Sequence, residues 1–143
     1  MLIKRIGHLA LTVEDMVKSL HFYCDVLGFA KAFELHDAED KPWIVYLRVC
    51  EGQFLELFYG GLNKPEPVHR PIGFNHLCLE VENIDEIAGH LKKHGIPLDV
   101  EPKQGKDTNY QCWARDPDGN RIEFMQVMPG SPQMRGHQSE LEQ

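Results

Sequence analysis

Two short stretches of the chain alternate between apolar and polar positions, which is the pattern of a half-buried β-strand. The first covers residues 6–13 and the second covers residues 74–81. In the first stretch Leu9, Leu11 and Val13 share one face, so His8 lies on the other. Each stretch therefore predicts a strand with one face against a core and one face that carries polar side chains.

A helix is expected after each of these strands, because apolar residues recur there at helical spacing. We expect Thr12 and Asp15 to form a capping box at the start of the first helix. Gly28 and Gly95 stand where a residue in the left-handed conformation ends a helix. The residues at helical spacing are Met16, Val17, Leu20, Tyr23 and Leu27 in the first copy, and Ile84, Ile87, Ala88 and Leu91 in the second.

Three further strands complete each copy of the pattern. A strong turn signal, Asp116-Pro117-Asp118-Gly119, stands between the last two strands of the second copy. The expected strands are Lys31–Leu35, Trp43–Val49 and Phe54–Tyr59 in the first copy, and Leu98–Glu101, Tyr110–Arg115 and Arg121–Val127 in the second.

The two copies keep one register along the chain, which indicates a tandem duplication. The offset is 68 positions at the strand histidines and 67 at the helix-ending glycines and at the glutamates of the last strands. We therefore predict an α+β fold of two modules, each strand–helix–strand–strand–strand, whose helix-free faces pack together or line a cup. The expected boundaries are residues 1–59 for the first module, 60–73 for a linker, 74–128 for the second module and 129–143 for a polar tail, either mobile or an arm on a partner subunit.

Composition narrows the class of protein. The 143 residues carry a net charge of −7, which argues against a nucleic-acid binder. No apolar run is long enough to cross a membrane, and the first residues lack the apolar stretch of a secretory signal peptide. The four cysteines have no Cys-x-x-Cys spacing and are interpreted as reduced, mostly apolar fillers. We expect a cytoplasmic protein with a small-molecule substrate and neither a nucleic-acid nor a membrane partner.

Four polar residues at repeat-related positions carry the candidate chemistry. Strand parity places His8, Glu56, His76 and Glu123 on the helix-free faces, each within a short apolar strand. Two imidazoles and two carboxylates that converge would suit one divalent metal ion, with nickel, cobalt, manganese, iron or zinc as candidates. The alternative is a buried, hydrogen-bonded His–Glu pair in each module with no metal.

The motifs around these residues resemble the vicinal oxygen chelate superfamily, also called the glyoxalase, bleomycin-resistance and extradiol dioxygenase superfamily. The resemblance covers residues 3–128 and implies tandem βαβββ modules that form a cupped mixed sheet around a metal site. Its carriers are Gly7-His8-Leu9-Ala10-Leu11, the helix ending in Leu27-Gly28-Phe29, Leu55-Glu56-Leu57, Asn75-His76-Leu77, and Asp116-Pro117-Asp118-Gly119-Asn120-Arg121-Ile122-Glu123.

The His/Glu/His/Glu set is similar to that of glyoxalase I. The resemblance implies a metal-dependent lyase or isomerase that moves a proton between adjacent oxygen-bearing carbons of an α-hydroxycarbonyl substrate through an enediolate. Its metal would be nickel, zinc, cobalt or manganese rather than iron. Glu123 would be the general base, with Glu56 assisting or taking that role for the other stereochemistry. Thr12 and Gly60 stand where glyoxalase I has its glutathione-binding Arg and Asn, so an α-hydroxycarbonyl substrate other than a glutathione adduct is a second option that the sequence leaves open.

Two other functions stay open from the sequence. One is an Fe(II)-dependent dioxygenase of the extradiol type, and the other is a non-catalytic protein that binds a small molecule. A homodimer is implied by the resemblance, with the modules paired within one chain or exchanged between two. Other polar candidates are weaker: His90 and His94 are expected on a solvated helix face, and Arg115 and Arg121 beside the turn could bind an anion or face solvent.

Overall fold

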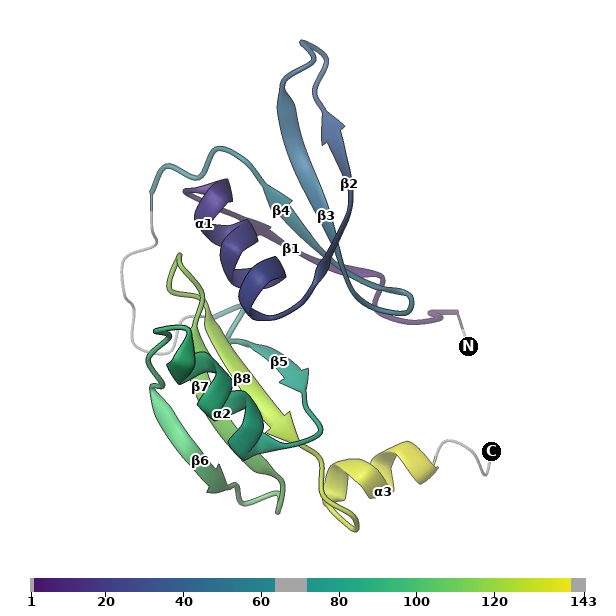
Figure 1. Cartoon of the computed structure of the whole chain (residues 1–143). Helices are drawn as coiled ribbons and strands as arrows, with labels where there is room; N and C mark the ends of the chain where they lie inside the picture. Colours follow the sequence, from purple (N-terminus) through teal and green to yellow (C-terminus); the bar gives the residue numbers. More distant parts are fainter. Residues whose placement is uncertain (1, 64–71, 140–143) are drawn as a thin grey trace. The chain divides into compact units, whose positions relative to one another are not determined.

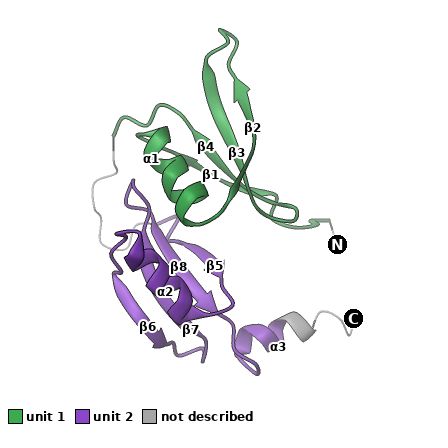
Figure 2. Cartoon of the chain, viewed as in Figure 1, with its two compact units in different colours: residues 1–67 green, residues 68–143 purple. Residues whose placement is uncertain are grey.

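A computed structural model describes residues 2–63 and 72–139 of the chain (Figure 1). The chain divides into two compact units, Met1–Pro67 and Val68–Gln143, which Figure 2 colours separately. Most of the linker predicted at 60–73, namely residues 64–71, lies outside the described residues.

Each unit is a four-stranded mixed sheet with one helical segment between its first and second strands. Strand orders are β1-β4-β3-β2 and β5-β8-β7-β6, with the first strand of each unit parallel to the last and the other pairs antiparallel. This confirms the α+β prediction of two βαβββ modules. The elements of the first unit are β1 (His8–Thr12), α1 (Met16–Leu20), η1 (His21–Val26), β2 (Ala30–His36), β3 (Pro42–Cys50) and β4 (Gln53–Phe58). Those of the second are β5 (Leu77–Glu80), α2 (Ile84–Lys93), β6 (Val100–Gln104), β7 (Tyr110–Arg115) and β8 (Arg121–Gln126), followed by α3 (Pro132–Ser139).

The helix of each unit covers one face of its own sheet, and the core lies between them (Figure 1). Leu55 and Leu57 of β4 are buried in the first unit, and Ile122 and Phe124 of β8 are buried in the second. Burial of each such side chain contributes about 1.5–3 kcal/mol. Because side chains alternate along a strand, the residues between them project to the helix-free face.

The first helical segment differs from its prediction. A regular helix was expected from Met16 to Leu27, but only α1 is α-helical and η1 has the wider turns of a π-helix. The wider turn rotates the later residues, so Phe22, Tyr23 and Val26 are buried. Val17, expected on the apolar stripe, is 77% exposed.

The caps of both helical segments follow the same plan. Asp15 is itself the N-cap of α1 and accepts a hydrogen bond from Lys18 N at 3.1 Å, which replaces the expected capping box with Thr12. Asn83, not singled out in the sequence, caps α2 by accepting from two backbone N–H groups. Gly28 and Gly95 have φ of 81° and 74°, as expected for helix-ending glycines.

The polar tail predicted at 129–143 contains regular structure. The helix α3 covers Pro132–Ser139, an element that the sequence pattern did not predict. Ser131, fully buried, begins it by accepting a hydrogen bond from Met134 N. None of the helices in the described residues combines the length and apolarity needed to cross a membrane.

Candidate metal centre

The first unit brings His8 and Glu56 together on its helix-free face. His8 begins β1, and Glu56 lies in β4 opposite Ala10. His8 Nδ1 lies 3.1 Å from Glu56 Oε1. The carboxylate is buried whereas the imidazole is half exposed, with side-chain exposures of 5% and 51%. Apart from this contact with the His8 ring, Glu56 Oε1 has no hydrogen-bond partner, so a cation bound beside the imidazole would stabilise this buried oxygen.

The second unit contains an equivalent His–Glu pair, in which a different nitrogen of the imidazole ring faces the carboxylate. His76 Nε2 lies 3.0 Å from Glu123 Oε2, and the side chains are 30% and 15% exposed. His76 Nδ1 lies 2.7 Å from Asn75 Oδ1. Because an amide oxygen only accepts, Nδ1 carries a hydrogen in this contact, and the lone pair of a neutral ring is then at Nε2. That lone pair faces a carboxylate, an arrangement that a shared proton or a metal cation would stabilise.

The structure brings these four side chains together as one His–Glu pair in each unit, and it differs from the prediction in two details. His76 precedes β5 rather than lying in a strand, and His8 is the first residue of β1 rather than central. The histidines are consequently more exposed than their carboxylates. In the described part of either unit, no group of three or more His, Cys, Asp or Glu side chains gathers at one point, so each unit supplies a pair of donors.

An aromatic residue stands beside each carboxylate at equivalent positions of the two modules. Tyr46 of β3 is the cross-strand partner of Glu56, and Trp113 of β7 is the partner of Glu123. A side-chain hydrogen bond to Glu56 raises the pKa of Tyr46, with burial and the carboxylate charge adding to it. Trp113 donates its indole N–H elsewhere, to Gln111 Oε1 at 2.9 Å. The two carboxylates thus have different neighbours.

Cys78 is a site neighbour that the sequence analysis assigned only as an apolar filler. It pairs with Glu123 across the parallel strands β5 and β8. Cys78 is exposed by its surface area, but partial desolvation, followed by the charge of Glu123 and a hydrogen bond to it, raises the pKa of the Cys78 thiol to about 12. All four cysteines are free, and Cys112 alone among them is buried. The parity that identified His76 also places Cys78 on the polar face, so that signal was in the sequence.

The turn that precedes β8 positions Glu123. Asp116 Oδ1 accepts hydrogen bonds from the backbone N–H groups of Asp118 and Asn120 at 3.0 and 2.8 Å. Gly119 has φ of 88°, a conformation that favours glycine. The predicted turn is therefore confirmed, and it fixes the register of the β7–β8 hairpin.

The remaining polar candidates have structural partners. Arg115 pairs with Asp99 at 2.7 Å and donates to Gly119 O, and the Arg121 guanidinium lies 4.5 Å from the centre of the Trp113 ring. His94 Nδ1 lies 2.9 Å from His90 O of the same helix. We therefore assign no separate site to the two arginines or to this histidine pair.

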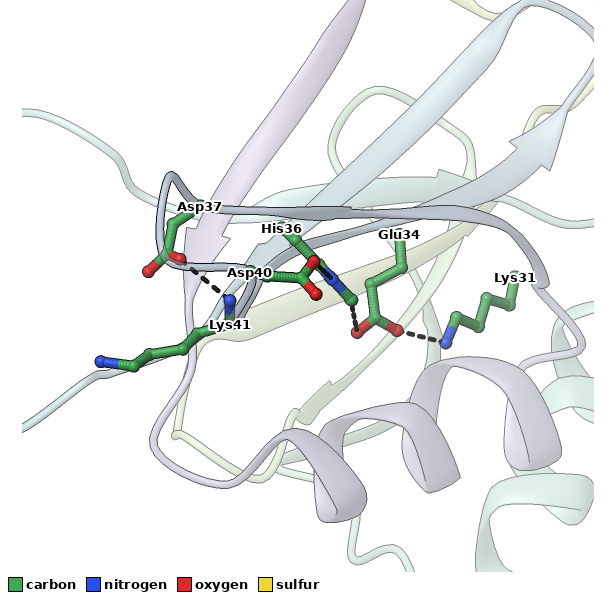
Figure 3. Close-up of polar contacts among 6 residues, drawn as sticks. All are labelled: Lys31, Glu34, His36, Asp37, Asp40 and Lys41. Carbon is green, nitrogen blue, oxygen red and sulfur yellow. Dashed lines mark hydrogen bonds and ion pairs between the residues drawn. The ribbon is translucent and has the colours of Figure 1, made fainter.

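A second polar network lies on the β2–β3 hairpin (Figure 3). Lys31 Nζ contacts Glu34 Oε2 at 2.5 Å, and His36 Nε2 lies 3.6 Å from Glu34 Oε1. His36 Nδ1 lies 2.9 Å from Asp40 Oδ1. The hydrogen bond to Asp40 is the main cause that raises the pKa of His36 above its usual value. The network therefore links residues of β2 and of the turn before β3 through ion pairs that are mostly exposed to solvent.

Known proteins similar to this chain place it in a family. Residues 5–124 match the Glyoxalase/Bleomycin resistance protein/Dioxygenase superfamily. The chain belongs to this superfamily. It is 31% identical over 129 residues to a probable lactoylglutathione lyase of Synechocystis, with 84% of the chain and 93% of the relative covered.

Two further members of the superfamily show its range. Over 129 residues the chain is 35% identical to an iron-dependent extradiol dioxygenase of Rhodococcus jostii, covering 83% of the chain but 42% of that enzyme. The crystal structure of a glyoxalase family protein from Enterococcus faecalis matches with a TM-score of 0.73 and 28% identity, covering 88% of the chain and all of that protein. Membership of the superfamily therefore does not by itself fix an activity, because the named relatives of the chain have different ones.

Proposed function

We propose that the protein is a metal-dependent lyase or isomerase of the glyoxalase I type. On this proposal His8, Glu56, His76 and Glu123 hold one divalent ion, with the two pairs supplied by one chain or by two copies of it. The observation that carries the proposal is the repeated His–Glu pair, in which an imidazole nitrogen lies 3.0–3.1 Å from a carboxylate oxygen. The relatives named lactoylglutathione lyase support it.

The donor set fits such an ion on two observations. Apart from its contact with His8, Glu56 Oε1 is buried without a hydrogen bond, and His76 Nε2 is left as the free ring nitrogen by the contact of Nδ1 with Asn75. Two imidazoles and two carboxylates without thiolate favour nickel, zinc, cobalt or manganese. When bound, the ion would polarise two neighbouring oxygens of the substrate as a Lewis acid.

The residues of the chain supply the proton transfer. On the proposal Glu123, the more exposed carboxylate, takes a proton from one oxygen-bearing carbon of an α-hydroxycarbonyl substrate and returns it to the adjacent carbon. Glu56 is more buried and is the cross-strand partner of Tyr46, which suits a ligand that assists. Apolar side chains on the same faces would exclude water from the reacting carbons.

Metal analysis of the purified protein after reconstitution with nickel or zinc tests the site. We expect one ion for each set of four ligands, and loss of binding in His8→Ala and in His76→Ala. His21→Ala is a matched control, because His21 lies on η1 in contact with Asp25. Full metal content in both ligand variants would overturn the site.

An activity measurement then separates the two enzymatic functions. With α-hydroxycarbonyl substrates, the metal-loaded protein should exchange the carbon-bound proton with deuterium from solvent, and Glu123→Gln should lower the rate about 10²–10⁴-fold with metal still bound. The dioxygenase relative favours a second candidate. Oxygen uptake with catechols in the Fe(II) protein, without proton exchange, would support that function and refute the first.

A further inference from the structure

A hollow of about 640 Å³ lies in the first unit, where β3 ends and β2 begins. Residues 48–52, which form the end of β3 and its turn to β4, line one side of it. Gly28 and Ala30, at the beginning of β2, line the other. The proposed metal centre uses none of these residues, so the hollow is a feature without an assigned role.

Two arginines border this hollow. Arg48 is exposed and lines it directly. The segment before β1 runs beside the turn between β3 and β4 (Figure 1), and the Arg5 guanidinium lies against Gly52, where an added Cβ would overlap it. Because Gly52 has φ of 70°, glycine allows both the turn and this close approach.

The charge of these arginines is not neutralised by neighbouring acidic groups. Among the residues that the structure describes, neither Arg5 nor Arg48 forms an ion pair. Glu51 also lines the hollow, but its side chain is exposed on the turn. A guanidinium presents a planar fork of N–H donors that matches two oxygens of a carboxylate or a phosphate. The hollow is therefore suited to an oxyanion.

Strand register places Arg48 on the same sheet face as the His8–Glu56 pair. Arg48 pairs with Phe54 of β4, and Phe54 pairs in turn with His8 of β1. Paired residues project to one face, so these three side chains form a row across the sheet. Two strand spacings, about 10 Å, separate the backbones of Arg48 and His8. A small molecule that contacts the His8–Glu56 pair can therefore extend towards Arg48.

We propose that this hollow is an oxyanion subsite, in which Arg48 and Arg5 bind a carboxylate or phosphate group of a small molecule. The substrate class that follows rests on the proposed function: an α-hydroxycarbonyl compound with such a group at the end remote from the metal. Arg48 then determines specificity and takes no part in holding the metal or in moving the proton.

NMR titration of the metal-free protein with sodium phosphate, and separately with sodium acetate, tests the subsite at constant ionic strength. The backbone amide signals of residues 48–52 should shift saturably. Arg48→Ala and Arg5→Ala should each weaken binding about 10-fold, the effect of losing a charge-assisted hydrogen bond. Arg48→Lys keeps the charge but loses the fork, so its affinity should fall between those of Arg48→Ala and the wild type.

Arg115→Ala is the matched control, because it removes the same charge from an arginine that is paired with Asp99 in the second unit. Tighter binding of phosphate than of acetate identifies a phosphoryl group as the anion, and the reverse order identifies a carboxylate. The subsite is refuted if neither anion shifts residues 48–52 saturably, or if Arg115→Ala weakens binding as much as Arg48→Ala.

Kinetics of the metal-loaded protein then test the substrate class. The charged substrate is glyceraldehyde 3-phosphate or tartronate semialdehyde, whichever carries the preferred anion, and neutral glyceraldehyde is the reference. Arg48→Ala should raise KM for the charged substrate about 10-fold and leave KM for glyceraldehyde unchanged. If the anion binds but none of these compounds is turned over, the proposed function fails and the subsite stands. Equal KM values for the charged substrate in Arg48→Ala and the wild type would overturn the role of Arg48 in specificity.

Discussion

Asn75 holds His76 through the ring nitrogen that does not face the carboxylate, with 2.7 Å between Asn75 Oδ1 and His76 Nδ1. The corresponding place before His8 is Gly7, which has no side chain to make such a contact. His8 instead presents Nδ1 to its glutamate. The second histidine of the proposed site is therefore oriented by a neighbouring side chain, and the first is not.

Asn75→Ala should weaken metal binding without unfolding the protein. The contact sets which nitrogen of His76 is free, and loss of such a group costs about 10–100-fold in metal affinity. Calorimetric titration with zinc or nickel measures it. Asn63→Ala serves as control, since Asn63 is exposed. Equal affinities in the two variants would show that Asn75 does not orient the ring.

The hairpin network predicts a pH dependence in the first unit. The pKa of His36 is raised in the folded protein. The stability that protonated His36 contributes is therefore fully present below the pKa of the unfolded state, about 6.5, and is lost as pH rises through the pKa of the folded state. Asp40→Asn should lower the His36 midpoint seen by proton NMR. His21, paired with Asp25, provides an internal reference resonance. No change in the His36 midpoint would contradict the role of Asp40.

Removing a buried side chain from β4 should strongly destabilise the protein. Leu57 is completely buried, so Leu57→Ala should destabilise the protein by about 2–5 kcal/mol in urea unfolding. Leu62→Ala makes the same chemical change at a residue that is 88% exposed, and should have almost no effect. If Leu57→Ala lowers the free energy of unfolding no more than Leu62→Ala does, Leu57 is not part of the core.

Two glycine-to-alanine substitutions should change the stability of the protein in opposite directions. Gly28 has φ of 81°, so Gly28→Ala forces a strained conformation and should destabilise by about 1 kcal/mol. Gly89 lies within α2 with open space around an added Cβ, so Gly89→Ala should stabilise by about 0.5–1 kcal/mol. Thermal unfolding of both variants measures the difference, and a shift in the same direction would refute the conformational argument.

The sequence predicts most of the fold because alternation and helical spacing are local signals that the duplication repeats. Tyr110–Arg115 was predicted with both bounds correct, and the Asp116 turn was also found. Strand parity correctly placed Glu56 and Glu123 beside their histidines. These predictions needed only the direction of successive side chains.

Other features depend on contacts that periodicity does not contain. The place of Tyr46 beside Glu56 follows from cross-strand register, which is set only when β3 and β4 pair. The π-helical turns of η1, in which Val26 is buried, are likewise absent from the spacing of apolar residues. The exposure of His8 and His76 follows from their places at strand ends. Register, helix type and strand ends were thus the quantities that the pattern left undetermined.

The π-helical segment also explains why the two modules are not of equal length. The N-caps Asp15 and Asn83 are 68 positions apart, whereas Gly28 and Gly95 are 67 apart, so one extra residue lies between cap and terminator in the first module. A π-turn accommodates one residue more than an α-turn. The trace of an insertion or deletion after the duplication is therefore confined to a single helix, and the strands that carry the glutamates kept their alignment through that event.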